Sequence, residues 1–125
     1  MSGIVAALSD SDMANAASFY SQQAIRPDPA ANAHLAAIGQ RIFAAGVGPG
    51  MMSSCAMCHG SGRSGGMSGM MGNVPNLYGQ HAAYIIDQLN RFADGERQGS
   101  PMNRIAPALS ETNKRAVAEF LSGVP

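Results

Sequence analysis

The sequence predicts an all-α domain, and three observations support this prediction. Apolar residues recur at helical spacing in four segments, within residues 1–23, 30–45, 81–93 and 110–122. Two of these segments follow a serine, Ser9 or Ser110, which is a residue type that caps helices. No convincing strand pattern, in which apolar and polar residues alternate, lies between them. We therefore expect helices joined by loops rich in glycine and proline.

The first helix is expected within residues 1–23. Asp12 follows Ser9 by three positions, an acidic version of the capping box, and apolar residues at helical spacing follow from Met13 to Tyr20. Residues 26–30 contain two prolines, each of which disfavours a helical conformation in the residue before it. We interpret 1–25 as a separate helical segment, 26–30 as a linker and 31–125 as the main domain.

The main domain contains the other three helices, each with one apolar face. Gly39 lies within the face of the helix at 30–45, where it permits the backbone of another helix to approach closely. The apolar faces are expected to consist of Leu35, Ile38 and Ile42 in that helix, of Tyr84, Ile85, Leu89 and Phe92 in the next, and of Val117, Phe120 and Leu121 in the last.

One short motif carries the chemistry, Cys55-Ala56-Met57-Cys58-His59. Two cysteines three positions apart and followed directly by histidine form the c-type haem attachment pattern. Positions three apart lie on one face of a helix, so both sulfurs can form thioethers with one porphyrin. The imidazole of His59 can then bind the iron. The motif predicts one covalent haem c, attached through Cys55 and Cys58.

Two other interpretations of the motif compete with haem. A thiol–disulfide redox pair normally lies near a strand–helix–strand pattern, and the sequence shows no convincing strand. A structural zinc site needs about four ligands. The sequence offers only His34 and His81 beyond the motif, and no further cysteine.

Composition limits the partners. Eight basic and eight acidic side chains balance in a chain of 125 residues, which argues against nucleic acid as the partner. The sequence has no membrane-spanning stretch, and residues 1–8 lack the features of a signal peptide. Covalent haem attachment of this kind usually takes place outside the bacterial cytoplasm. We therefore expect a periplasmic protein whose signal peptide is absent from this sequence.

The two ends of the chain resemble each other. Residues 1–19 align with 102–120 at an offset of 101, and the match includes Ala7-Leu8-Ser9 with Ala108-Leu109-Ser110 and Phe19 with Phe120. We interpret the N-terminal helix as the remnant of a preceding haem domain. An unrelated amphipathic extension is the alternative.

With these residues placed, the segment from about residue 30 to 125 resembles a class I cytochrome c, and the resemblance is greatest to the C-terminal domain of dihaem, c-four-type cytochromes. The resemblance implies the class I fold around one haem. It also implies that the Pro75 carbonyl accepts a hydrogen bond from His59, because Pro75-Asn76-Leu77 and Gly79 match the turn beneath the haem histidine. Met102 matches the position of the sixth iron ligand.

Other methionines compete with Met102 for the iron. Met67, Met70 and Met71 have the reach, although the Pro75 turn is expected to hold them on the histidine side. They also resemble a soft copper(I) surface, since thioethers suit that ion. More often such methionines pack loosely over an apolar edge. Gln80 and Arg97 are candidate donors to the haem propionates.

These features predict a single-electron carrier with a His59/Met102-ligated haem, and not an enzyme. Its partners would be redox proteins such as a terminal oxidase or reductase, and the first helix is expected to fold back on the domain or to form a dimer. One alternative is an electron-relay domain of a larger oxidoreductase. The other is an open-site haem enzyme or gas sensor, which requires that Met102 does not bind.

Overall fold

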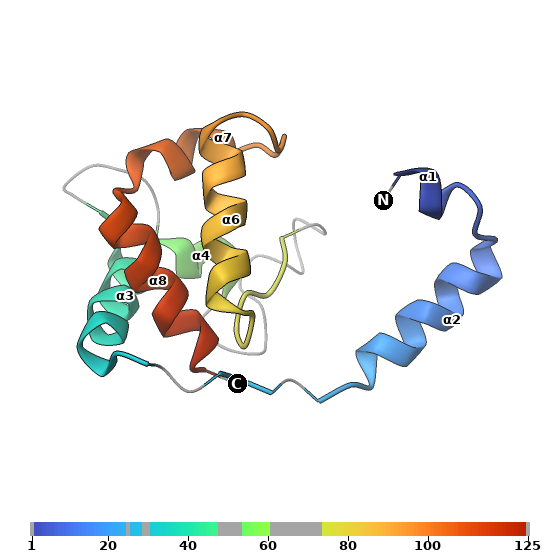
Figure 1. The fold of residues 1–125 in the computed structure, drawn as a ribbon, viewed down its shortest axis with the longest axis horizontal. Coiled ribbons are helices and arrows are strands. Elements are labelled where there is room, and N and C mark those ends of the chain that lie inside the picture. Colours follow the sequence, from blue (N-terminus) through green and yellow to red (C-terminus); the bar gives the residue numbers. More distant parts are fainter. Residues whose placement is uncertain (1, 25, 29–30, 48–53, 61–73, 125) are drawn as a thin grey trace.

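The computed structural model describes residues 2–24, 26–28, 31–47, 54–60 and 74–124, and these residues contain helices but no strand. Figure 1 shows the main domain as a group of packed helices, with the two N-terminal helices lying apart from it. In chain order the elements are α1 (Ser2–Val5), α2 (Asp10–Ser21), α3 (Ala33–Ala45), α4 (Cys55–His59), α6 (Ala82–Ala93), α7 (Met102–Ile105), the 3-10 helix η1 (Ala106–Ala108) and α8 (Glu111–Ser122).

The crossing of α3 and α8 is the main packing contact of the domain (Figure 1). It depends on Gly39, because a Cβ atom at this position would lie 1.9 Å from the carbonyl oxygen of Ala116. The backbones of the two helices therefore touch directly. The expected close approach at Gly39 is confirmed.

Helix α6 packs against the other side of α8 and covers the rest of the core. Ile85 and Leu89 of α6 are buried against the core, together with Val117 and Leu121 of α8. The buried ammonium group of Lys114 lies at this seam, and its Nζ donates to Asn90 Oδ1 and Glu111 Oε1, each at 2.8 Å. A buried cation needs such partners to offset its lost hydration.

Side-chain caps explain where the helices begin. Ser9, Asn32, Ser54 and Ser110 each accept a hydrogen bond from a backbone N–H of the following first turn. Helix α3 begins at Ala33 and not at residue 30, because the side-chain oxygen Oδ1 of Asn32 accepts a hydrogen bond from the backbone amide of Leu35 at 2.9 Å. The short helices α7 and η1 lie in a segment for which we expected no helix.

The helical spacing predicts that Tyr84 belongs to the buried face of its helix, and this prediction is wrong. Tyr84 is 49% exposed, although its neighbours Ile85 and Leu89 on α6 are buried. The apolar face of α6 is narrower than the spacing indicates, and Tyr84 lies at its solvent-facing edge.

The N-terminal segment does not fold back on the domain, so this part of the expectation is wrong. None of the residues of α2 is buried, and Phe19 and Tyr20 are 61% and 72% exposed. Asp28, in the expected linker, contacts the domain through a 2.8 Å hydrogen bond between its Oδ2 and His81 Nδ1. Within the described residues, no helix has the length and apolar character needed to cross a membrane.

Candidate haem site

Helix α4 places the two thiols. It begins after Ser54, whose hydroxyl accepts the amide of Met57 at 3.2 Å, and it ends at Gly60, where φ is +85°. In this single turn of helix, Cys55 and Cys58 lie on the same face. Both are free thiols and half-buried, while Met57 between them is 51% exposed. Burial raises the pKa of the Cys55 thiol, and the nearby Cys58 adds to this effect.

His59 is buried, and its ring is oriented by one hydrogen bond. Its Nδ1 lies 2.8 Å from the carbonyl oxygen of Pro75, as the family resemblance implies. A carbonyl oxygen can only accept, so Nδ1 must carry the proton. In neutral imidazole the lone pair then lies on Nε2, which is the form that can bind a metal.

The turn that contains Pro75 is fixed from two directions. Within the turn, Asn76 Oδ1 accepts the amide of Tyr78 at 3.0 Å, and Gly79 has a φ of +71°, which favours glycine. Across the domain, the amide of Gly79 donates to the carbonyl of Leu121 on α8 at 2.9 Å. The end of α8 therefore helps to hold the acceptor of the His59 hydrogen bond in place.

Tyr78 joins the turn to α4, a role that we did not predict. Its ring is buried and packs edge-on against Phe43 of α3 and Phe120 of α8, with centroid distances of 5.7 and 6.2 Å. Its hydroxyl lies 3.5 Å from the carbonyl oxygen of Gly60, the residue after His59. The sequence alone leaves two interpretations of Tyr78, as a residue that lines the haem crevice or as a core residue, and its ring is buried in the core cluster.

Met102 is the first residue of α7. It is half-buried and packs against the core that α6 and α8 form. Its position follows the loop that leaves the end of α6, so the main chain returns to the core at this methionine. Met67, Met70 and Met71, which the sequence offers as rival ligands and as an alternative copper(I) surface, lie outside the described residues.

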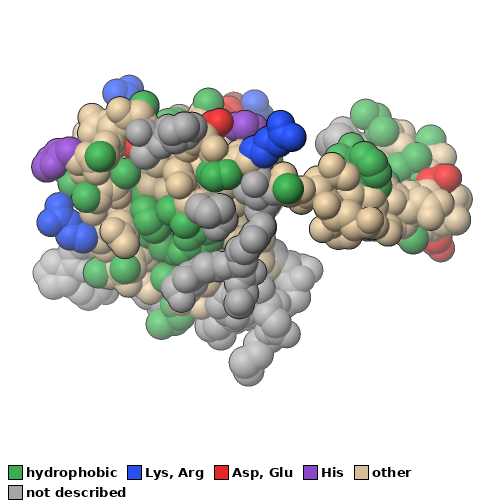
Figure 2. Space-filling view, turned by 90° about the horizontal axis from the view of Figure 1, so that it is seen from below, with side chains coloured by type: hydrophobic (Ala, Val, Ile, Leu, Met, Phe, Trp, Pro, Cys, Tyr) green, Lys and Arg blue, Asp and Glu red, His purple; other side chains and the backbone are tan. Residues whose placement is uncertain are grey.

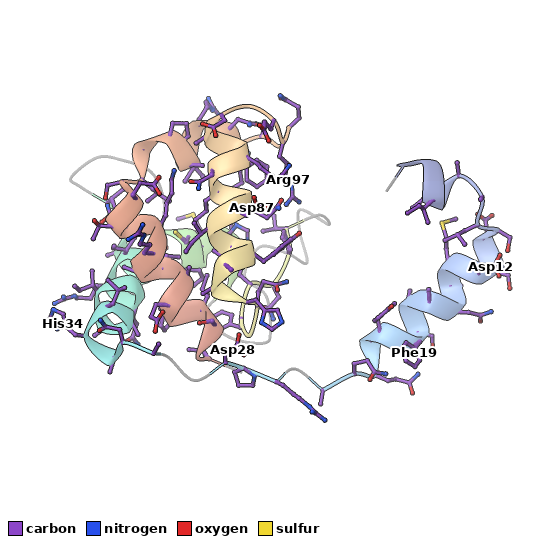
Figure 3. The ribbon with its side chains drawn as sticks, in the orientation of Figure 1. Asp12, Phe19, Asp28, His34, Asp87 and Arg97 are labelled. Carbon is purple, nitrogen blue, oxygen red and sulfur yellow. The ribbon has the colours of Figure 1, made fainter. Side chains whose placement is uncertain are left out.

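The two candidate propionate donors have protein partners. The side-chain oxygen of Gln80, Oε1, accepts the amide of His81 at 2.9 Å, which leaves its NH₂ group as a donor. The guanidinium of Arg97 donates to Gln88 Oε1 and lies 4.7 Å above the ring of Phe92. It is exposed, and Figure 3 shows it beside α6, near Asp87.

The donor set fits a covalent haem. Two thiols lie on one face of a helical turn, the next residue is a buried imidazole oriented through Nδ1, and a half-buried methionine is available elsewhere on the core. Thioethers require the two thiols, and iron binding requires the free Nε2 of His59.

Comparison with known proteins agrees with this geometry. Residues 36–125 match the family model described as "Cytochrome c". The chain belongs to the cytochrome c family. This membership decides against the disulfide and zinc interpretations, and the chain carries one haem c bound covalently through Cys55 and Cys58.

The chain spans about 60% of the length of the two curated relatives described next. It is 33% identical to a thiosulfate dehydrogenase electron acceptor of Thiomonas intermedia over 130 residues, which cover 100% of the chain and 58% of that protein. It is 30% identical to a cytochrome c4 of Pseudomonas aeruginosa, with 99% of the chain and 62% of that protein covered. The crystal structure of reduced recombinant cytochrome c4 from Pseudomonas stutzeri superposes with a TM-score of 0.84 at 30% identity, covering 98% of the chain and 65% of that structure.

These matches confirm the all-α class I fold and the similarity to c-four-type cytochromes. They also confirm that the domain is of the electron-carrier type. The sequence also offers an apolar contact patch for redox partners, formed by Met51, Met52 and residues 65–72, and this patch lies outside the described residues.

Proposed function

We propose that the chain transfers single electrons between redox proteins, with His59 and Met102 as the two residues that would bind the iron of its haem. The observation that carries this proposal is the hydrogen bond from His59 Nδ1 to the Pro75 carbonyl, which leaves the Nε2 lone pair of the residue directly after Cys58 for a metal. The haem iron supplies the chemistry, because it takes up and gives up one electron. The protein supplies ligands and excludes water.

The two ligands have different effects on the electron. The hydrogen bond to Pro75 holds the imidazole of His59 in one tautomer and raises its basicity. A thioether such as that of Met102 is soft and neutral, which favours ferrous iron and raises the potential relative to a second imidazole. With both positions filled by the protein, little reorganisation would accompany electron transfer, and the domain itself would carry out no bond chemistry.

Absorption spectra of the purified holoprotein in both redox states test the ligand set. We expect the oxidised protein to show the methionine-to-iron charge-transfer band, and we expect Met102→Ala to abolish it. Met57→Ala is the matched control, because Met57 is exposed on the outer side of α4 and should leave the band unchanged. A band that survives Met102→Ala would assign the sixth ligand elsewhere, and its absence from the unaltered protein would favour the open-site enzyme or sensor.

For the partners, we propose periplasmic redox proteins, with a terminal oxidase or reductase as the acceptor class. The relay alternative is favoured by one observation, that a relative over the whole chain is named as an electron acceptor of thiosulfate dehydrogenase. Stopped-flow mixing of the reduced protein with oxidised candidate partners distinguishes them. Electron transfer to a free partner favours the carrier, whereas exchange confined to a stable complex favours the relay.

We also propose that Gln80 and Arg97 donate hydrogen bonds to haem propionates. Support comes from the NH₂ group of Gln80, which remains a donor after Oε1 has accepted the amide of His81. Arg97 has five N–H donors and uses one of them on Gln88, so the others remain for a propionate. Replacing Arg97 by methionine should lower the reduction potential, because a positive charge near the haem disfavours the ferric form. An unchanged potential would remove Arg97 from the site.

Finally, we propose that residues 1–25 are the end of a preceding haem domain. At the offset of 101 residues, α2 (Asp10–Ser21) coincides with α8 (Glu111–Ser122) over all 12 residues. Their N-caps Ser9 and Ser110 have similar backbone angles, with ψ of 162° and 159°. Figure 2 shows hydrophobic side chains at the surface of the N-terminal helices, whereas the corresponding helix α8 buries its apolar residues in the core.

The haem content of the protein expressed from its full gene tests this repeat. We expect two haems per chain and a second cysteine pair with histidine ahead of residue 1, and a single haem would contradict the proposal. In the 125-residue chain, we expect the exposed face of α2 to pair two copies. Sedimentation should then depend on concentration, and Phe19→Ser should abolish this dependence; a monomer throughout would exclude the dimer and leave the repeat standing.

A further inference from the structure

The side-chain amide of Asn103 holds the loop between α6 and Met102 at several points. Its Oδ1 accepts the backbone amide of Gly99 at 2.7 Å. Its Nδ2 donates to the carbonyl oxygens of Phe92 at 2.9 Å and Arg97 at 2.7 Å. One side chain therefore binds the last turn of α6 and two separate points of the loop.

The orientation of this amide is determined by its partners. Nδ2 faces two carbonyl oxygens, which only accept, and Oδ1 faces an N–H group, which only donates. Exchanging the oxygen and nitrogen positions would turn all three contacts into repulsions. The Phe92 carbonyl belongs to the last turn of α6, where carbonyls lack partners within the helix, so Asn103 also caps α6.

The loop is further fixed on the ring of Phe92. A Cβ atom at Gly99 would lie 2.8 Å from Phe92 Cε1, so the backbone of Gly99 rests on the ring edge. The guanidinium of Arg97 covers the ring at 4.7 Å. The backbone N–H of Asn103 in turn donates to the backbone carbonyl of Gly99 at 3.1 Å. The two residues are therefore joined by a reciprocal pair of hydrogen bonds.

We propose that Asn103 is the positioning residue for the sixth ligand, a role that rests on the proposed ligation by Met102. Asn103 is the next residue along the chain, so the three side-chain hydrogen bonds fix the backbone from which the methionine side chain projects. When they are lost, the loop opens more often. An external ligand that binds only the open form then gains apparent affinity in proportion to the open fraction.

Imidazole binding to the oxidised holoprotein measures the open fraction. We expect Asn103→Ala and Asn103→Asp to bind imidazole at least about tenfold more tightly than the unaltered protein, since hydrogen bonds are lost in both. Asn103→Asp keeps the acceptor for Gly99 but places a carboxylate against two carbonyls. Both variants should also show a weaker charge-transfer band at neutral pH than the unaltered protein.

Two controls separate positioning from general loosening. Asn90→Ala removes the amide partner of Lys114 at the α6–α8 seam and should lower the urea midpoint without changing the imidazole affinity. Gln98→Ala removes another side-chain hydrogen bond of the same loop, to the Gly95 carbonyl at 2.8 Å, and should change neither by much.

The outcomes are distinguishable from failure of the ligand proposal. If Met102→Ala abolishes the band but the Asn103 variants bind imidazole like the unaltered protein, the positioning role is overturned and the ligand stands. An equal gain of imidazole affinity in Asn90→Ala would also overturn the positioning role. The same holds if neither Asn103 variant folds around haem. Either result would assign Asn103 a purely structural role. Survival of the band in Met102→Ala refutes the ligand proposal itself.

Discussion

Gly39→Ala should destabilise the domain strongly, because the new methyl group would meet backbone and not a movable side chain. The added Cβ would lie 1.9 Å from the oxygen and 2.4 Å from the carbon of the Ala116 carbonyl. Ordinary contacts are 3.4 Å or longer, so α3 and α8 would have to separate by more than an ångström. Overpacking typically costs about 1–3 kcal/mol, and this contact belongs at the upper end.

A gain in helix propensity offsets part of this cost. Alanine favours a helix over glycine by about 1 kcal/mol, which leaves a net loss of about 2 kcal/mol in the free energy of unfolding. This is a large fraction of the 5–15 kcal/mol typical of a domain, so at the usual urea dependence the midpoint should fall by about 1–2 M.

Urea unfolding of the holoprotein, followed by far-ultraviolet circular dichroism, measures this loss. Gly3→Ala is the matched control, because Gly3 lies in α1 and a Cβ there would have no atom within 4 Å. It should leave the midpoint of the main domain unchanged. A Gly39→Ala midpoint equal to that of the unaltered protein would refute the close crossing of α3 and α8.

Three further predictions concern pH and capping. Burial raises the pKa of Tyr78 above its usual 10.0, so the folded form binds the phenolic proton more tightly than the unfolded form. The free energy of unfolding should therefore fall as pH rises above 10. Urea titrations should show this fall, and Tyr78→Phe should flatten it. Hydrogen bonds from Ser9 lower the pKa of Asp12 below its usual 3.8, so the stabilisation of α2 is present above pH 3.8 and is lost as pH falls through the lowered pKa. Amide NMR shifts of α2 should report this loss, which Asp12→Asn should abolish. Asn32→Ala should destabilise the domain by about 1 kcal/mol through its lost cap on α3, as measured by urea unfolding.

Features that depend on neighbouring residues in the chain were predictable from the sequence. The cap at Ser110, the boundaries of α6 to within one residue and the placement of both thiols on one helical face all follow from local patterns. The close approach at Gly39 was also expected, because glycine in an apolar helix face has few other uses. These signals established the fold class.

Features that depend on contacts distant in sequence were not predictable. The hydroxyl of Tyr78 meets the Gly60 carbonyl 18 positions away, and the Asn103 amide meets the Phe92 carbonyl 11 positions away. No spacing rule connects such pairs, and asparagine is a common residue of loops and helix ends. The exposure of Tyr84 was missed for a related reason, since helical spacing indicates a face but not how much of it a neighbour covers.

Helices α2 and α8, the two helices of the repeat, show which features of a helix depend on adjacent residues and which depend on tertiary packing. Both α2 and α8 are 12 residues long and begin at a capping serine, because length and cap are determined by adjacent residues. Only α8 has buried residues, since only α8 meets a helix with a glycine at the crossing. The aromatic side chains at the matching positions show the same contrast. The ring of Phe120 packs at 5.7 Å from Phe43, whereas Phe19 is 61% exposed and its one aromatic ring contact within the described residues is with Tyr20. Local sequence thus suffices to specify such a helix, and a glycine-bearing partner helix is what turns it into part of a haem domain.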